Sequence, residues 1–247
     1  MVRRSMEPFT LRYFFEGGDE TLPFPVADFD ASPSALAEDR LGTLNEWLGD
    51  TSEFQGSIGQ GATIRGPVYT GKDAEIQSGV DIVGPVFVGE GCVIHHGAQL
   101  RPGTILGKGC VVGHTAEIKN SVCMSGAKLQ SGSFVGDSVV GKGGRIGSGA
   151  ILTNRRFAQD AVTLGGGRYK FHTDAEFFGA IIGDYARVGA NATTAPGTLI
   201  GPYSWILPLV SAYGFIPRES QVRAKQELLI TPNPARQLRS GRGEYAQ

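Results

Sequence analysis

A six-residue repeat occupies residues 58–124 and limits the possible folds more than any other feature of the chain. A large apolar residue recurs at every sixth position, only Thr70 breaks the series, and a small or β-branched residue stands four positions after each one. A period of six fits neither a helix nor a single strand. It predicts a solenoid, in which each short unit buries its apolar side chains by stacking on its neighbours. The large apolar residues are Ile58, Ile64, Ile76, Ile82, Val88, Ile94, Leu100, Leu106, Val112, Ile118 and Met124.

Three repeats make one larger unit, and the interval of three repeats separates His96 from His114 and Cys92 from Cys110. We therefore predict a triangular coil with one short parallel strand on each side, which makes the chain an all-β parallel β-helix. The apolar positions point inward, and polar residues occupy the corners and outer faces. Cys92 and Cys110 are expected to stack inside the coil as small hydrophobic residues.

The repeat is interrupted twice. It slips at residues 130–137, and it is absent from residues 153–179, a stretch rich in aromatic and basic residues. A loop of this length within a compact domain is usually functional or disordered. Ile182 follows Leu152 by a whole number of repeats, so the loop is predicted to extrude from the solenoid without changing its frame.

Residues 1–54 lack the repeat and are predicted to form a capping segment. The aromatic run at residues 8–15 suggests a short strand, and Ser32 followed by a proline resembles the start of a helix. Apolar residues then keep helical spacing as far as Leu48, and Gly49 is the expected stop. We expect this helix to close one end of the solenoid, because open sheet edges invite pairing with other chains.

The predicted β-helix covers residues 55–210, with the extruded loop at 153–179. Residues 211–247 are predicted to hold a short amphipathic helix at 218–230 and then a polar tail. Two prolines, Pro232 and Pro234, are expected to end this helix.

Composition excludes several classes of protein. The net charge of the 247-residue chain is −1, which argues against a nucleic-acid surface built on bulk charge. No apolar run approaches the roughly 20 residues that a membrane span needs, and residues 1–10 lack the apolar core of a secretion signal. The three cysteines are an odd number without a disulfide pattern. We expect a cytoplasmic protein that binds neither nucleic acid nor a membrane.

The repeats resemble the left-handed parallel β-helix of hexapeptide-repeat acyltransferases, and three segments narrow the resemblance. They are LRPGTILGKGCVVGHTAEIKNSVCMSGAKL, FVGDSVVGKGGRIGSGAILTNRRF and GAIIGDYARVGANATTAPGTLIGP. Together they resemble the acetyltransferase half of bifunctional sugar-1-phosphate nucleotidylyltransferases of the N-acetylglucosamine-1-phosphate uridyltransferase type, over residues 55–210. The N-terminal segment has no glycine-rich nucleotide loop and is too short for the other half, so we expect no nucleotidyl transfer.

The resemblance implies a homotrimer in which acetyl-CoA acetylates the amine of a sugar-1-phosphate, in a cleft between neighbouring subunits. It places the sugar phosphate at Arg101 and Lys119, which are three repeats apart and so stack on successive coils. Two cations on one face suit a phosphate, and arginine can bind it through two parallel hydrogen bonds. By the same matching, the substrate-binding positions are Arg101, Lys119, Phe134, Arg145, Asn154 and Arg155, and the CoA groove includes Ser148, Gly189 and Ala190.

The chain departs from the family pattern where the chemistry takes place. The resemblance puts the general-base histidine of the family at Ser131, and a serine cannot take an amine proton at neutral pH as an imidazole can. Phe134 replaces a tyrosine of the family, Arg145 replaces an asparagine, and Arg155 replaces a second tyrosine. These departures indicate that the family reaction is absent or that the substrate differs.

Other histidines and carboxylates give weaker signals. His114 stacks on His96 and is predicted to have a structural or surface role, whereas His172 in the extruded loop is a candidate base. The histidine spacing is wrong for a shared metal site, so no metal is expected. Asp137 and Asp184 each follow a glycine at a corner and are interpreted as turn residues.

The sequence is compatible with three functions. The first is a trimeric CoA-dependent acyltransferase acting on a sugar phosphate or nucleotide sugar, with substrate positioning supplying most of the catalysis. The second is a catalytically lapsed β-helix that binds a ligand or serves in assembly. In it, Arg145 and Arg155 would suit a more anionic ligand, such as a nucleotide sugar. A scaffold whose terminal segments bind a partner protein is a third interpretation.

Overall fold

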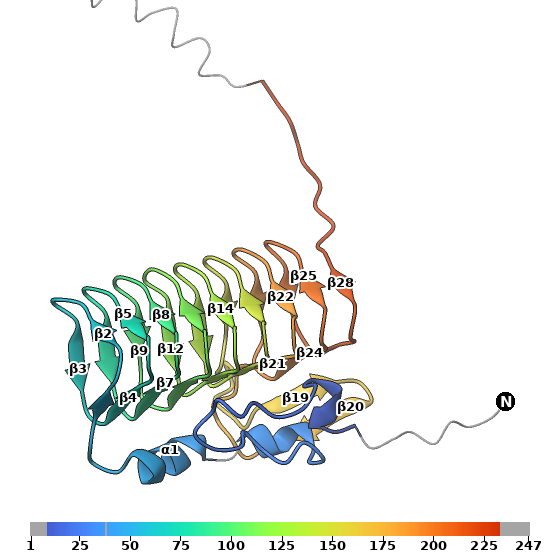
Figure 1. Cartoon of the computed structure of the whole chain (residues 1–247). Helices are drawn as coiled ribbons and strands as arrows, with labels where there is room; N and C mark the ends of the chain where they lie inside the picture. The colour runs from blue at the N-terminus through green and yellow to red at the C-terminus, as the bar shows by residue number, and fades with distance from the viewer. Residues whose placement is uncertain (1–8, 38, 233–247) are drawn as a thin grey trace, which may run out of the picture.

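The computed structural model describes residues 9–37 and 39–232. In these residues the chain winds into a parallel β-helix whose three long sides are three sheets, and the N-terminal segment lies against one side (Figure 1). Each sheet takes one short strand from every coil, as the all-β prediction requires. No helix in the described part of the chain is long and apolar enough to cross a membrane.

We number the sheets by the coil side that they form. Sheet 1 contains β1 (Glu53–Phe54), β4 (Val68–Thr70), β7 (Val86–Val88), β10 (Thr104–Leu106), β13 (Val122–Cys123), β16 (Val139–Val140), β21 (Ala180–Ile182), β24 (Thr198–Ile200) and β27 (Phe215–Ile216). Sheet 2 contains β2 (Ser57–Ile58), β5 (Glu75–Ile76), β8 (Val93–Ile94), β11 (Val111–Val112), β14 (Lys128–Leu129), β17 (Arg145–Ile146), β22 (Arg187–Val188), β25 (Trp205–Ile206) and β28 (Gln221–Val222). Sheet 3 contains β3 (Thr63–Arg65), β6 (Asp81–Val83), β9 (Gln99–Leu100), β12 (Glu117–Lys119), β15 (Phe134–Gly136), β18 (Ile151–Leu152), β23 (Thr193–Thr194) and β26 (Ser211–Ala212).

The core of the solenoid is the stack of inward side chains that the repeat predicts. Equivalent apolar residues pair across successive coils, as Ile64 does with Ile82 and Ile76 with Ile94. The stacked residues form one continuous buried cluster along the coil axis. Cys92 and Cys110 both belong to it, as predicted, and Thr70 is buried in the series without a hydrogen-bond partner for its hydroxyl.

The slip predicted at residues 130–137 was right in part, because one shortened corner contains Asp137, but an earlier one at Asn120 was missed. Leu106 pairs with Cys123, and Ile118 pairs with Val135, so each of these steps falls one position short of three full repeats. Cys123 therefore takes the inward position expected for Met124, and Met124 belongs to a second apolar cluster outside the coil. The corners between sheets 3 and 1 are shortened here, and each contains a residue in the left-handed conformation, Asn120 (φ 44°) or Asp137 (φ 46°).

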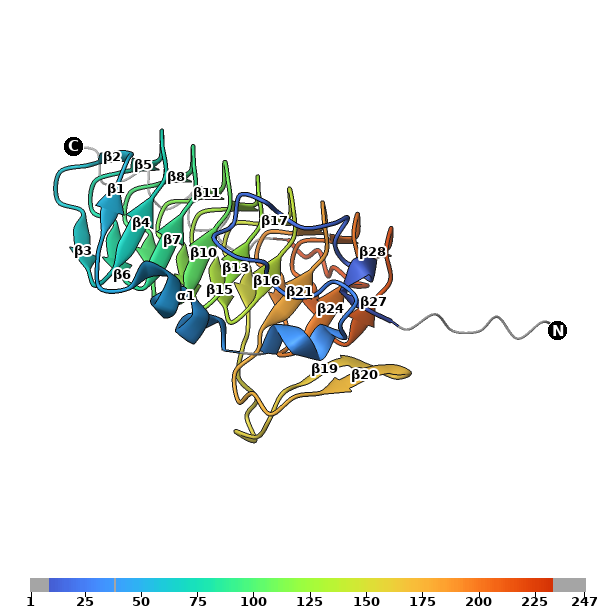
Figure 2. The same ribbon diagram turned by 60° about the horizontal axis from the view of Figure 1, so that its bottom comes forward.

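The N-terminal segment does not close the solenoid end. It runs along the outer face of sheet 1, whose outward side chains are apolar (Figure 2). These include Phe87, Ile105, Val139, Ile181 and Leu199, which the segment covers with Leu11, Phe14, Phe15, Leu36 and Leu44. Covering the outer face of sheet 1 removes more apolar surface from water than covering the solenoid end would, because the face is much longer than one coil.

The predicted local structure of this segment was partly right. The aromatic run forms a single 3₁₀ turn, η1 (Leu11–Tyr13), where a strand was expected. The expected helix is broken into η2 (Pro33–Ala37) and α1 (Arg40–Leu48). The side chain of Asp39 accepts a hydrogen bond from the Gly42 N–H at the start of α1, and Gly49 ends it as predicted.

The extruded loop forms a hairpin and returns in frame. Its strands are β19 (Thr163–Gly166) and β20 (Tyr169–His172), and Val140 pairs with Ile182 across the loop as the repeat predicts. The hairpin lies beside the N-terminal segment, where Phe9 packs on Tyr169 and Phe171 (Figure 1). Two segments far apart in the sequence thus cover the same side of the solenoid.

The predicted C-terminal helix is absent. Strands β26 to β28 continue the coil beyond Pro208, so the repeat spans residues 53–222 in place of 55–210. Residues 223–232 are extended, and residues 233–247 of the predicted tail lie outside the described residues. The helix prediction failed because the last coil is shorter than three repeats: Ile200 pairs with Ile216 and Ile206 with Val222, a step that the six-residue pattern does not match.

Candidate functional site

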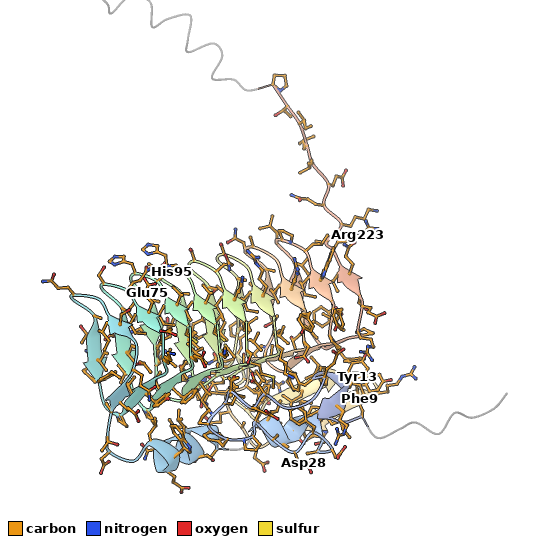
Figure 3. The ribbon with its side chains drawn as sticks, in the orientation of Figure 1. Phe9, Tyr13, Asp28, Glu75, His95 and Arg223 are labelled. Atoms are coloured by element: carbon orange, nitrogen blue, oxygen red, sulfur yellow. The ribbon has the colours of Figure 1, made fainter. Side chains whose placement is uncertain are left out.

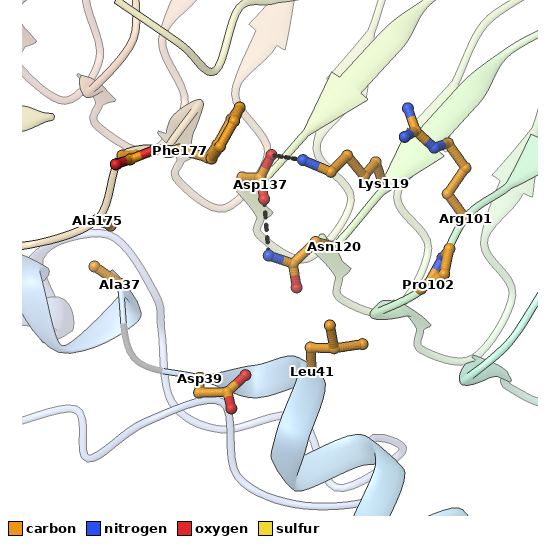
Figure 4. A pocket seen from close by; sticks show the side chains of 11 residues that line it. Ala37, Asp39, Leu41, Arg101, Pro102, Lys119, Asn120, Asp137, Ala175 and Phe177 are labelled. Carbon is orange, nitrogen blue, oxygen red and sulfur yellow. Dashed lines mark hydrogen bonds and ion pairs between the residues drawn. The ribbon is translucent and has the colours of Figure 1, made fainter. Parts of the chain in front are cut away.

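A cavity of about 480 Å³ lies where three parts of the chain meet: the corner between sheets 3 and 1, the start of α1, and the end of the extruded loop. Figure 4 shows Lys119, Asn120 and Asp137 on the solenoid side, with Asp39 and Leu41 facing them from the helix. We call it the jaw pocket. Its lining residues are Ala37, Asp39, Leu41, Arg101, Pro102, Lys119, Asn120, Asp137, Ala175, Glu176 and Phe177.

Asp137 is the structural centre of the jaw pocket. It is only 3% exposed, and its carboxylate accepts hydrogen bonds from the side chains of Lys119 (3.1 Å), Asn120 (2.8 Å) and Asn154 (2.5 Å). Its backbone carbonyl accepts a further bond from the N–H of Gly179 at the end of the loop. Asp137 therefore fixes both ends of the loop to the solenoid, a role beyond that of the predicted turn residue.

The two cations expected to hold a phosphate do lie together in the jaw pocket. Each already has a carboxylate partner, since Arg101 pairs with Glu117 at 2.8 Å and Lys119 with Asp137 at 3.1 Å. Arg101 is the more available, because its side chain is 41% exposed whereas that of Lys119 is 26% exposed. A phosphate entering the pocket would compete with these carboxylates, whereas sugar hydroxyl groups could bond to both members of each pair.

Three other predicted substrate residues border the jaw pocket. The Asn154 side chain donates a hydrogen bond to Asp137, which lines the pocket. The Phe134 ring and the Asn154 amide both lie next to Gly136. A Cβ atom at Gly136 would lie 2.7 Å from the Asn154 amide nitrogen and 2.8 Å from the Phe134 ring, so a larger residue here would displace one of these side chains. Arg155 shares the Phe177 ring with Lys119, whose ammonium is 4.4 Å from the ring centre.

The remaining predicted residues lie elsewhere on the chain. Ser131, Ser148 and Ala190 occupy one corner, between sheets 2 and 3, where Gly149 donates to the Ser131 carbonyl and Asn191 to the Ser148 carbonyl. Gly189 precedes Ala190 in this corner. Arg145 is exposed on the outer face of sheet 2, and His172 is exposed at the end of β20.

Three of the four histidines line a cavity together with Ser131. A second cavity, of about 260 Å³, is lined by Gln77, His95, His96, Val111, Gly113, His114, Gln130 and Ser131, and we call it the histidine pocket. Figure 3 places His95 on the side of the solenoid away from the N-terminal segment. The His96 and His114 rings are stacked, with centres 5.5 Å apart and planes at 11°.

Backbone carbonyls fix the tautomers of these rings. Nδ1 of His114 lies 2.7 Å from the His96 carbonyl oxygen, and Nδ1 of His96 lies 2.6 Å from the Ser78 carbonyl oxygen. A carbonyl can only accept, so each Nδ1 donates, and in the neutral imidazole the lone pair then lies on Nε2. The pocket beside Ser131 thus contains imidazole nitrogens able to accept a proton, which the sequence pattern did not reveal.

Two carboxylates, the buried Asp184 and the half-buried Asp19, attach the N-terminal segment to the solenoid. Burial raises the pKa of Asp184 above its usual value, although the backbone N–H groups of Glu16 and Lys142 that donate to it offset part of that increase. Burial by itself would raise the pKa of Asp19. Hydrogen bonds from Thr21 and Ser125 lower the pKa by a larger amount, so that it lies below its usual value. Both carboxylates hold the segment that forms one wall of the jaw pocket.

No group of three or more histidine, cysteine or acidic side chains is arranged to hold a metal ion within residues 9–37 and 39–232. The chemistry that the two pockets offer is hydrogen bonding, charge pairing and proton acceptance by imidazole.

The fold and these pockets define a hexapeptide-repeat parallel β-helix protein with its polar sites at coil corners. Residues 82–169 match the GMPPB C-terminal domain family. Over 168 residues the chain is 37% identical to the bifunctional sugar-1-phosphate nucleotidylyltransferase/acetyltransferase of Sulfurisphaera tokodaii, a match that covers 67% of this chain and 42% of that protein. The chain is thus a homologue of these enzymes, as its motifs predict, and it spans less than half of the relative's length.

Solved structures with a similar coil include the UDP-N-acetylglucosamine acyltransferases of Francisella novicida and Arabidopsis. The first is 14% identical with a TM-score of 0.33, and the similarity covers 66% of this chain and 67% of the other. The second is also 14% identical with a TM-score of 0.30, covering 77% and 75% of the two chains.

Proposed function

We propose that this chain is an acyltransferase that moves an acetyl group from CoA to a sugar phosphate or a nucleotide sugar, and that it acts as a homotrimer. The observation that carries the proposal is the meeting of Arg101, Lys119 and Asn154 around the jaw pocket of a chain that is homologous to a sugar-1-phosphate acetyltransferase. In this function Arg101 and Lys119 hold the phosphate, and the Asp137 network orients the sugar hydroxyls.

The base in this proposal is His114. Its Nε2 keeps a lone pair, and its ring lines the same pocket as the Ser131 side chain. A base at this place takes the proton of the acceptor amine or hydroxyl as that atom bonds to the acetyl carbon and the CoA thiol leaves. Such proton transfer raises the rate by about 10²–10⁴-fold. Ser148, Gly189 and Ala190 continue along the same corner and form the wall for the CoA arm.

The faces that stay uncovered support the proposed trimer. Sheet 1 is covered by the chain's own N-terminal segment and hairpin, whereas the outward side chains of sheets 2 and 3 are exposed, as in β17 and β18, or half-exposed, as in β12. In this proposal subunit contacts are centred on sheet 3 and its corner with sheet 2, which brings the histidine pocket of one chain near a neighbour. Mass measurement in solution tests this, and a stable monomer contradicts it.

Thiol release from acetyl-CoA in the presence of amino-sugar phosphates and nucleotide sugars tests the activity. Lys119→Ala is expected to raise KM for the acceptor by about 10–100-fold, the value of a hydrogen bond to a charged group. Lys108→Ala, which removes an exposed ion-paired cation elsewhere, is the control. His114→Gln should lower kcat, and adding Ser131→His should restore it. Absence of turnover with every acceptor, together with absence of CoA binding, contradicts the proposal.

The ion pairs in the jaw pocket favour a second candidate function. Because Arg101 and Lys119 are already neutralised by Glu117 and Asp137, the pocket suits a neutral sugar ring as well as a phosphate. The chain would then be a catalytically lapsed module that binds a sugar or nucleotide sugar. Thermal stabilisation by such ligands without any thiol release distinguishes this function from the first.

A further inference from the structure

Three cations stack directly on one another on the outer face of sheet 2. Lys128 pairs with Arg145, and Arg145 pairs with Arg187, although the whole extruded loop separates the last two in the sequence. All three side chains point outward and are exposed, because each is the outer residue of a strand whose other residue is buried. We call this row the cation ladder.

The cation ladder has no counter-charge. Within the described residues, none of its members forms an ion pair, in contrast to Arg65, Arg101 and Lys119 on sheet 3. The nearest acid in the same row is Glu75, which Val93 and Val111 separate from Lys128. Like charges on directly paired residues destabilise a sheet. A bound anion would reduce the repulsion between these three cations.

An exposed aromatic residue continues the row. Trp205 pairs with Arg187, is 49% exposed, and has the Arg187 guanidinium 6.0 Å from its ring centre. The next residue in the row is Gln221, which ends the pattern. Strands are about 4.8 Å apart, so the row from Lys128 to Trp205 is about 14 Å long. This footprint fits a small molecule with an aromatic ring at one end and a string of phosphates, and it is too short for a nucleic acid strand.

We propose that the cation ladder and Trp205 form a binding site for the nucleoside diphosphate group of a nucleotide sugar. The base stacks on Trp205, an interaction worth about 1–3 kcal/mol in other proteins, and the phosphates lie over Arg187 and Arg145. Arginine suits this role because its planar fork forms two parallel hydrogen bonds with a phosphate. The inference rests on the nucleotide-sugar acceptor of the proposed function and assigns its diphosphate to sheet 2, whereas Arg101 and Lys119 would hold a sugar phosphate, and binding at this site requires no catalysis.

Calorimetry on the full chain at low ionic strength tests the site with UDP, GDP, ADP, inorganic pyrophosphate and CoA. We expect at least one nucleoside diphosphate to bind more tightly than pyrophosphate, and binding to weaken as salt is added. The triple variant Lys128→Gln, Arg145→Gln, Arg187→Gln should weaken it by at least tenfold. Trp205→Leu should weaken nucleotide binding and leave pyrophosphate unchanged.

Lys72→Gln, an exposed cation on an early coil away from the ladder, is the matched control and should bind as the wild type does. All substituted side chains are exposed, so circular dichroism should show an unchanged fold. Three results overturn the proposal: no nucleoside diphosphate binds, the triple variant binds as well as the wild type, or only CoA binds through the ladder. Nucleotide binding without thiol release supports the site while contradicting acyl transfer, so the two proposals fail separately.

Discussion

Replacing Asp137 with alanine tests the central interaction of the jaw pocket. The substitution removes the acceptor of three side-chain hydrogen bonds, and it leaves the Lys119 ammonium without its partner. Three bonds to a charged group at about 1.5–3 kcal/mol each set the upper limit of the effect. Water reaches Lys119, whose side chain is 26% exposed, so part of that loss is recovered. We expect the free energy of unfolding to fall by about 3–5 kcal/mol, which is typical of breaking a buried pair.

For a chain of this size, that loss lowers Tm by about 6–20 °C. Because the Asn154 side chain at the start of the loop loses its carboxylate partner, we also expect faster proteolysis within the loop at residues 153–179. Glu90→Ala is the control: it breaks the Lys108–Glu90 pair, whose side chains are 53% and 50% exposed, and should cost less than about 1 kcal/mol. A Tm for Asp137→Ala within error of the Glu90→Ala value, with unchanged loop proteolysis, would refute the reasoning.

Three further predictions concern single residues. Gly136→Ala should push the Asn154 amide away from its carboxylate partner and destabilise the loop, which amide hydrogen exchange can measure. Asp19→Asn should lower Tm at neutral pH. Since the folded pKa of Asp19 lies below its usual 3.8, its contribution is present above that pH and is lost as pH falls through the folded pKa, so the Tm difference should shrink in acid. Burial raises the pKa of Cys123 to about 12, so a thiol reagent at pH 8 should modify it only after unfolding.

For each of these predictions, one result would contradict it. Unchanged exchange in Gly136→Ala would mean that the loop adjusts without cost. A Tm difference for Asp19→Asn that stays constant from neutral to acid pH would mean that the carboxylate charge does not hold the segment. Rapid labelling of Cys123 in the folded chain would mean that the coil opens readily.

The solenoid could be predicted from the sequence because its register is local. Each inward residue contacts the residue one coil away, so a period of six is enough to specify the stack, and it carried the frame correctly from Leu152 across the loop to Ile182. The same logic correctly brought Arg101 and Lys119 together. It failed where coils are shortened, at Cys123 and after Pro208, because the pattern contains no information on corner length.

Contacts between distant segments were decided only by the tertiary structure. The N-terminal segment lies on sheet 1 through bonds such as Asp19 to Ser125 and Glu16 to Asp184, which join residues 106 and 168 positions apart. No local pattern identifies such partners. The tautomer of His114 likewise depends on a carbonyl of the preceding coil. The repeat by itself determines the coil and the positions that it stacks, whereas the covered face, the jaw pocket and the cation ladder arise when segments without the repeat, or separated by the loop, meet in space.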